Sequence, residues 1–172
     1  MKTLVHYIIW RAGRREGFGA TKLNKVLWFS GARNYELRGK PITGASYVRQ
    51  THGPVPREIL SVTQELEDAG LVRTSEEHFH GFNMTRRMTD LKPDVAMFSE
   101  DELALVDWWI RHVDEDHSAG TISALSHDYT WEIAGMGEVI PLYAVLASRI
   151  RAPRGEELDW AKAEAKRLGL AT

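Results

Sequence analysis

The chain of 172 residues contains no cysteine. It therefore cannot form a disulfide, use a thiolate as a nucleophile, or build a zinc ribbon or an iron–sulfur cluster on cysteine ligands. The absence of cysteine is typical of the reducing cytosol, so we expect a cytoplasmic location. No segment reaches the roughly 18 apolar residues that a membrane-spanning helix needs. The apolar N-terminus is interrupted by His6 and followed by Arg11, Arg14 and Arg15, which is unlike a signal peptide.

Signatures of catalysis and of cofactor binding are also missing. The sequence has no complete glycine-rich phosphate loop and no Gly-x-Ser-x-Gly nucleophile elbow. Ser126, His127 and Asp128 are the three residue types of a hydrolytic triad. However, neighbours on the helix predicted here project about 100° apart, so they cannot align as nucleophile, base and orienting group. We therefore expect no enzyme and no cofactor.

A metal site is not expected either. His78 and His80 stand two residues apart in a predicted strand and could face the same side, with His52 as the nearest candidate for a third ligand. No acidic residue follows at a spacing that completes a zinc site. Exposed histidines on a hairpin are the simpler interpretation.

The hydrophobic pattern predicts an α+β fold, predominantly α-helical, with a small antiparallel sheet of two or three strands. Gly39 ends the second helix, and Ser99 with Glu102 forms a capping box at the start of a later one. A short helix or extended run follows Pro141. The expected elements are helices over 2–12, 21–38, 56–69, 99–115 and 121–135, a strand over 46–50, and a hairpin formed by 71–74 and 80–86.

Two of these helices have informative apolar patterns. Apolar side chains nearly surround the helix 21–38, which predicts that it is buried at the centre of the domain. In the helix 121–135, apolar residues lie along one side: Ile122, Leu125, Tyr129 and Ile133.

The length and composition indicate one domain with a short appendage. We expect a domain over residues 1–150, a linker at 152–155, and a C-terminal amphipathic helix within 151–172 that packs on the domain or extends it. The apolar stripe of this helix, over 156–168, consists of Leu158, Ala161, Ala165 and Leu168.

The segment 40–56 is unusually constrained for a connection. Pro41 and Gly44 bracket a turn, and a short strand pattern follows. We expect residues 52–56 to stop this strand, because Pro54 and Pro56 lack backbone donors, and we expect Pro56 to lie in the first turn of the next helix.

The same segment carries a family resemblance. The ordered blocks 21–29, 39–44 and 52–56 (Thr-Lys-Leu-Asn-Lys-Val-Leu-Trp-Phe, Gly-Lys-Pro-Ile-Thr-Gly and His-Gly-Pro-Val-Pro), followed by Phe98–Glu102, Leu125–Asp128 with Trp131, and Gly137–Pro141, resemble the Panacea domain, the SocA-like antitoxin family. The resemblance covers about residues 5–145. No single motif is decisive, but the ordered set is specific.

This resemblance implies an antitoxin. Panacea-domain proteins are antitoxins of two-gene toxin–antitoxin systems in bacteria and phages, and they neutralise diverse toxins, commonly by direct binding. A SocA-type relative instead delivers its toxin to a protease. The chain lacks the obvious appended DNA-binding domain of some members. The expected partner is therefore a cognate toxin, which the chain neutralises by steric or conformational occlusion.

The predicted interface combines residue types that anchor protein–protein contacts. Tyr47, Arg49 and Thr51 project to one face of an extended strand, His52 lies at the following turn, and Arg57 follows it. Trp108 and Trp109 diverge on their helix, which indicates that one is partly exposed. We expect partner contacts from Tyr47, Arg49, His52, Arg57 and Trp109.

Other residues match the family blocks but are expected to hold the fold: Lys22, Lys25, Pro54, His127 and Trp131. His127 and Trp131 stand four residues apart, which predicts that the imidazole packs on the indole.

The alternative function is a winged-helix-like transcriptional regulator. In that case the helix 56–69 would enter the major groove of DNA and a hairpin with Arg86 and Arg87 would contact phosphate. The helix carries Arg57 against four acidic residues, a balance that repels the phosphate backbone. The sequence leaves open the identity of the toxin, the oligomeric state, including a homo-oligomer, and the route of neutralisation.

Overall fold

The computed structural model describes residues 1–149, 155, 163–164 and 166–167. Its helices are α1 (Lys2–Ala12), α2 (Ala20–Arg38), α3 (Ile59–Asp68), α4 (Glu100–Glu115), α5 (Ala119–Leu125) and α6 (Tyr129–Ile133), followed by the 3₁₀ helix η1 (Leu142–Arg149). One antiparallel sheet contains β1 (Tyr47–Gln50), β2 (Gly53–Pro56) and β5 (Val139–Ile140), in the order β2-β1-β5. The other is the hairpin of β3 (Arg73–Phe79) and β4 (Phe82–Met88). The predicted α+β class with dominant helices is confirmed.

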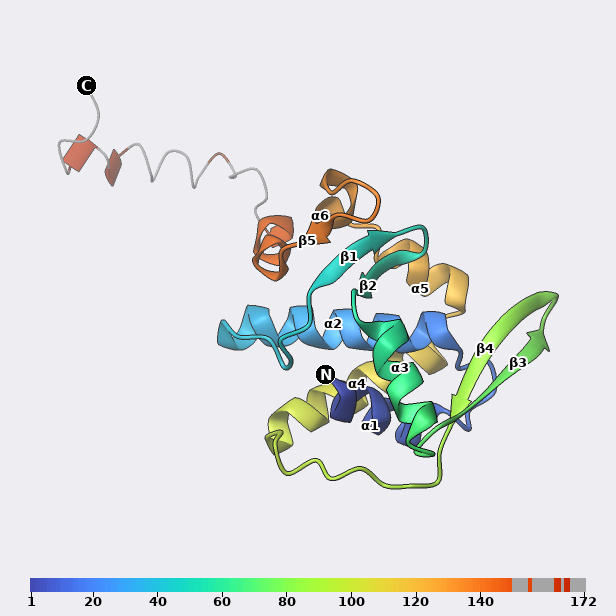
Figure 1. Cartoon of the computed structure of the whole chain (residues 1–172). Helices are drawn as coiled ribbons and strands as arrows, with labels where there is room; N and C mark the ends of the chain where they lie inside the picture. The colour runs from blue at the N-terminus through green and yellow to red at the C-terminus, as the bar shows by residue number, and fades with distance from the viewer. Residues whose placement is uncertain (150–154, 156–162, 165, 168–172) are drawn as a thin grey trace.

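Helix α2 runs through the middle of the fold, with α1 and α4 on one side and the three-stranded sheet and α5 on the other (Figure 1). Leu23, Val26, Leu27 and Trp28 of α2 are almost fully buried. The apolar side chains around this helix therefore meet partners on all sides, as the sequence predicts. Gly39 ends the helix in the left-handed conformation, at φ 68°, and its N–H donates to the carbonyl of Tyr35.

Helix α4 begins as predicted. The Ser99 hydroxyl accepts a hydrogen bond from the backbone N–H of Glu102, and the Glu102 carboxylate accepts one from the backbone N–H of Ser99. This reciprocal pair satisfies two backbone donors at the start of the helix. The inward positions Val106, Ile110 and Val113 are all buried.

The prediction that residues 52–56 stop the strand is wrong. Gly53–Pro56 is itself a strand, β2, which pairs antiparallel with β1. Pro54 and Pro56 fit there because β2 is an edge strand, where a missing N–H costs no ladder hydrogen bond. Helix α3 consequently starts at Ile59 rather than at Pro56.

The predicted helix 121–135 is also wrong. Two short helices, α5 and α6, replace it, and residues 126–128 form the break between them. Each new helix has its own cap: the Ser118 hydroxyl accepts from the N–H of Thr121, and the Asp128 carboxylate accepts from the N–H of Trp131. A polar residue that can cap a helix in this way competes with continuing the preceding one.

The strand β5 was not predicted. It is two residues long and pairs with Tyr47 and Val48 of β1. This pairing returns the chain after α6 to the sheet.

None of the described helices has the length and apolar character needed to cross a membrane. The predicted C-terminal helix 156–168 and the linker 152–155 lie largely outside the described residues. The division into a domain over 1–150 and an appendage over 151–172 stays a prediction.

Candidate functional site

Lys25 lies beside residues of two other family blocks, Gly53 and Ser126. It is on α2, and only 1% of its surface is exposed. Among the described residues, no hydrogen bond or ion pair joins its ammonium group. Burial without a counter-charge disfavours the charged form, which lowers the pKa of Lys25 to about 7.

The tight turn between β1 and β2 packs directly on this lysine. Gly53 has a φ of +98°, and a Cβ atom at this position would lie 2.4 Å from Lys25 Nζ and 2.0 Å from Ser126 Oγ. A side chain here would have to displace both Lys25 and Ser126, and the positive φ also favours glycine. The ammonium and the hydroxyl therefore lie on the same side of the Gly53 backbone.

Ser123 bonds this turn to α5, and Ser126 at the end of α5 lies against Gly53. The Ser123 hydroxyl donates to the carbonyl of His52 over 2.7 Å, and the Ser126 hydroxyl donates to the carbonyl of Ser123 over 2.7 Å. A serine beside a lysine of lowered pKa can act as a nucleophile. Here, however, Ser126 is fully buried and its proton already bonds a carbonyl. In this conformation Lys25 and Ser126 pack against the turn, and a substrate cannot reach the Ser126 hydroxyl.

Trp131 joins the turn to α6. The His127 ring stacks on its indole at 3.9 Å with an angle of 13° between the planes, as predicted. The guanidinium carbon of Arg49 also lies 3.9 Å from the ring centroid, in cation–π geometry. The indole N–H donates to the carbonyl of Gln50 over 3.0 Å. Strand β1 and helix α6 are therefore linked through one side chain.

The electrostatics of this cluster are dominated by positive charge. Burial lowers the pKa of His127, and the positive charges of Lys25, Arg49 and His52 lower it further. A neutral His127 can stack on Trp131 without adding another charge to the group. We refer below to Lys25, Arg49, Gly53, Ser126, His127 and Trp131 as the motif cluster.

The five predicted interface residues do not form one exposed surface. Tyr47 is only 4% exposed, and its hydroxyl donates to the carbonyl of Leu27. Arg49 is half-buried, and its guanidinium also donates to the carbonyls of Glu132 and Ala134. These bonds hold both side chains inside the protein.

The other three predicted residues are more accessible, although to different degrees. His52 and Arg57 are exposed near the two ends of β2. Trp109 is half-buried and stacks on Phe29 with 4.7 Å between centroids, while its neighbour Trp108 is exposed, which confirms that one of the two is partly exposed. The prediction that the two rings diverge is wrong, since their centroids lie 4.8 Å apart in an edge-to-face contact.

Two further family-block residues also make internal contacts. The Lys22 ammonium donates to the carboxylate and the carbonyl of Asp114. Pro54 is buried in β2 opposite Arg49. Lys22 and Pro54 thus hold the elements together.

The hairpin arginines are turned into the molecule. Arg86 donates to the carbonyls of Gly13 and Arg14 and forms an ion pair with Glu77. Arg87 lies 3.6 Å from the Glu67 carboxylate, and its side chain is largely buried. These bonds engage the charges that a winged-helix protein would present to phosphate, which disfavours the DNA-binding alternative.

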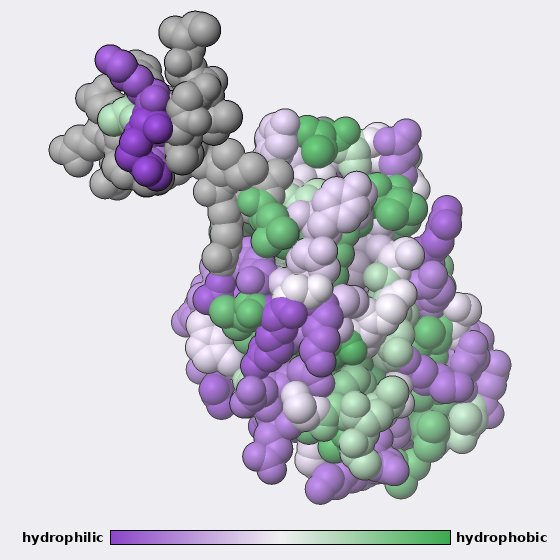
Figure 2. Space-filling model, turned by 90° about the vertical axis from the view of Figure 1, so that its left-hand side faces the viewer, coloured by the Kyte–Doolittle hydropathy of each residue, from purple (hydrophilic) through white to green (hydrophobic). Residues whose placement is uncertain are grey.

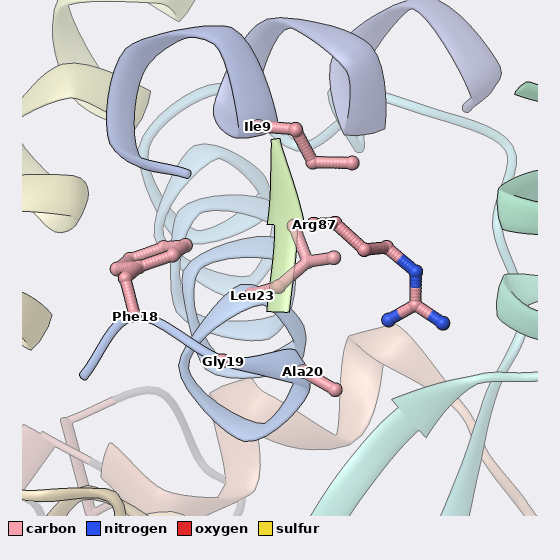
Figure 3. A pocket seen from close by; sticks show the side chains of 6 residues that line it. All are labelled: Ile9, Phe18, Gly19, Ala20, Leu23 and Arg87. Carbon is pink, nitrogen blue, oxygen red and sulfur yellow. The ribbon is translucent and has the colours of Figure 1, made fainter. Parts of the chain in front are cut away.

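The cavities are small or open. Figure 3 shows a pocket between α1, the start of α2 and Arg87 of β4, and its volume is about 10 Å³, room for a single water at most. A second cavity of about 210 Å³ is lined mainly by aromatic and charged side chains: Trp28, Phe29, Arg33, Glu36, Trp109 and Asp128, with Ala32 and Val145. A search of the described part of the chain finds no group of three side chains placed to hold a metal ion.

One feature escaped sequence reasoning. Leu125, Tyr129 and Ile133 are exposed rather than turned inward, and several apolar residues after them are exposed too. Gly135 and Gly137 could have indicated this exposure, because they interrupt the helix and the apolar residues around them no longer follow a helical period.

Comparison with known proteins agrees with the ordered blocks. A family model described as antitoxin SocA-like, Panacea domain, matches residues 23–132. Neither a search of curated proteins nor a search of solved structures found a match. The match covers more than half of the chain, and the chain belongs to the SocA-like Panacea family.

Proposed function

We propose that this member of the SocA-like Panacea family neutralises a cognate toxin by binding it directly, as the antitoxin of a bacterial or phage two-gene system. The observation that carries the proposal is the family match over residues 23–132, whose description names an antitoxin. An antitoxin requires a toxin as its partner. Direct binding is the simplest route by which a chain of this size can act on one.

The internal hydrogen bonds of the motif cluster support a structural role for its residues and not a catalytic one. Lys25 and Ser126 are buried under the β1–β2 turn, and Trp131 is contacted by two side chains and bonded to Gln50. Groups committed in this way stabilise a surface rather than react with a ligand. Neutralisation then proceeds by occlusion of the toxin, and a stable complex would bury roughly 1,600 Å² in total.

Among the predicted contacts, the exposed residues serve this proposal best. His52 and Arg57 can touch a partner directly, and Trp109 borders the larger cavity. Arg49 contributes indirectly, because its hydrogen bonds to the carbonyls of Glu132 and Ala134 position the surface segment around them. Tyr47 keeps a role in the core, since its hydroxyl is bonded to Leu27.

The test begins with the reading frame next to the gene of this chain. Its product, expressed alone, should arrest growth, and co-expression of this chain should restore growth. The two purified proteins should then form a stoichiometric complex in size-exclusion chromatography without any third component. Growth rescue without a complex would indicate delivery to a protease, and absence of rescue would contradict the antitoxin function.

The contribution of Arg57 can be tested with a charge reversal. Arg57→Glu should weaken the complex about tenfold, or ~1.4 kcal/mol, because an exposed interfacial charge changes sign. Arg111→Glu is the matched control, since Arg111 is exposed on α4 and no ion pair joins it within the described residues. Equal dissociation constants for the two variants, measured by isothermal titration calorimetry, would remove Arg57 from the interface.

A further inference from the structure

The exposed apolar residues of this protein are concentrated in one short segment. Of the 13 large hydrophobic side chains that are exposed in the described chain, six lie between residues 129 and 146. They are Tyr129, Ile133, Met136, Val139, Tyr143 and Leu146, and we call them the α6–η1 patch. Isolated exposed apolar residues are ordinary, but a concentration of them marks an interaction site.

The local structure places these residues on neighbouring elements. Helix α6 packs against η1, and β5 lies between them in sequence. Tyr129 and Ile133 are four residues apart on α6, and Tyr143 and Leu146 are three apart on η1, so each pair shares a face of its helix. Figure 2 shows strongly hydrophobic side chains gathered with paler ones at the upper end of the molecule, the end that α6, β5 and η1 form in Figure 1.

These side chains are exposed because Trp131, Arg49 and Glu138 hold the underlying backbone. Trp131 is bonded to Gln50, Arg49 is bonded to the carbonyls of Glu132 and Ala134, and Glu138 accepts from the N–H of Gly135. The backbone carbonyls of Glu132 and Ala134 and the indole N–H of Trp131 therefore face the protein, and Ile133, at 60% exposure, faces away from it. Four hydrogen bonds thus tie the backbone beneath the patch.

The segment that carries the patch has acidic side chains on its surface. Residues 129–146 contain two acidic residues, Glu132 and Glu138, and no lysine or arginine. Both glutamates are exposed, whereas Arg49, which bonds this segment from β1, is half-buried over Trp131. An apolar surface with an acidic border is complementary to an apolar surface with a basic border, and such complementarity speeds association and excludes unsuitable partners.

A cavity lies next to the patch. The 210 Å³ cavity is lined by Val145 of η1 and by Asp128 at the start of α6, and Phe29 and Trp109 supply stacked aromatic walls. The buried indole N–H of Trp109 has no hydrogen-bond acceptor among the described residues. An anchoring side chain of a partner can enter such a cavity, which is how interfaces concentrate their binding energy.

We propose that the α6–η1 patch is the apolar part of the docking surface for the toxin, separate from the contact of Arg57, and that the toxin presents an apolar surface bordered by lysine or arginine where it meets Glu132 and Glu138. This inference rests on the proposed function and names its site. Tyr143 and Ile133 anchor the contact, and Glu132 and Glu138 pair with the basic border. The motif cluster sets the position of this surface without touching the toxin.

The test removes apolar area while the fold is kept. In the full chain, the double variant Ile133→Ser/Tyr143→Ser should weaken binding of the co-purified toxin at least tenfold in calorimetry. The matched control is Leu60→Ser/Phe82→Ser, because Leu60 and Phe82 are 76% and 77% exposed on other elements. This control should leave the dissociation constant within twofold of the wild type.

A second arm tests the charge of the border. Glu132→Lys should slow association at low salt and reduce the salt dependence of the association rate in stopped-flow experiments. Glu76→Lys, at an exposed position of β3, should leave both quantities unchanged. If Glu132→Lys behaves like Glu76→Lys, the proposed basic border is wrong.

The outcomes separate this inference from the proposed function. If the wild type forms no complex with the toxin, the proposed function itself fails. If the wild type binds and the patch variant binds equally well, only the docking surface is overturned. Unchanged toxin affinity with an altered oligomeric state would assign the patch to a second copy. Unchanged affinity with a lowered Tm of the free variant would assign it to the C-terminal segment of this chain.

Discussion

The buried ammonium of Lys25 gives this protein a characteristic dependence of stability on pH. In the folded chain burial lowers the pKa of Lys25 from 10.5 to about 7. In the unfolded chain the same group is hydrated and titrates near its ordinary pKa of about 10.4. Between these two values the unfolded state binds more protons than the folded state. Linkage then requires the free energy of unfolding to rise with pH across this window.

The magnitude follows from the two pKa values. One pKa unit corresponds to about 1.4 kcal/mol, so the whole window is worth about 5 kcal/mol. From pH 7 to pH 9, where the folded lysine has become neutral and the unfolded one is still charged, the gain is about 2 kcal/mol. This is a large fraction of the stability of a typical small domain, about 5–15 kcal/mol.

Few other perturbed groups titrate in the same interval. The pKa values of His6 and His127 are lowered by burial below 6.5, and burial raises the pKa of Tyr7 to about 12. The pKa of Tyr47 is raised by burial as well. The shifts at these four residues therefore act mainly outside pH 7–9, which leaves the change in this interval to Lys25.

The assay is urea unfolding at pH 7, 8 and 9, followed by circular dichroism, on the wild type and on Lys25→Met. Methionine keeps most of the length of the side chain and removes the titrating group. The wild type should gain about 2 kcal/mol over this range, and Lys25→Met should be nearly flat. Lys40→Met is the control, since Lys40 is exposed, and it should follow the wild type. An equal slope in the wild type and in Lys25→Met would refute the reasoning.

Three further predictions concern positions fixed by single contacts. Gly53→Ala should cost about 2–4 kcal/mol in urea unfolding, because the left-handed strain adds to the clash with Lys25 and Ser126, whereas Gly70→Ala, at φ 67° with open space around it, should cost only about 1 kcal/mol; equal losses would remove the clash from the explanation. Tyr47→Phe should cost about 1 kcal/mol by removing the buried hydrogen bond from the Tyr47 hydroxyl to the Leu27 carbonyl, and should not change toxin affinity; a change would place Tyr47 in the interface. Ser99→Ala should lower the free energy of unfolding by about 1 kcal/mol through loss of the α4 cap, and no loss would mean that the cap adds nothing.

Elements with strong local signals could be predicted from the sequence. Helix α2 was recognisable from its apolar surroundings and from Gly39, and α4 from the capping box of Ser99 and Glu102. The stacking of His127 on Trp131 followed from a spacing of four residues, even though the two residues lie in a break and in α6 rather than in one helix. The spacing was sufficient because the first turn of α6 brings the two rings together.

The predictions failed where tertiary contacts determine the local structure. Residues 53–56 read as a strand breaker, yet the edge of a sheet tolerates proline, and only the pairing with β1 reveals that edge. The burial of Lys25 was also not predicted, because lysine is almost never fully buried without a paired charge. The contact between Gly53, Lys25 and Ser126 joins three distant segments, and no local pattern encodes it.

Buried positions with specific requirements and exposed positions without them occupy different parts of this chain. The family match ends at residue 132, so it contains the whole motif cluster, while most of the α6–η1 patch lies beyond it. Lys25, Gly53 and Trp131 need particular residue types, because burial, the absence of a Cβ atom and the bond to Gln50 are specific requirements. Exposed positions such as Ile133 and Tyr143 carry no such internal requirement, and substitutions there change the surface without changing the fold. A buried cluster that fixes the backbone and an outer patch free to vary is an arrangement that suits recognition of one particular toxin.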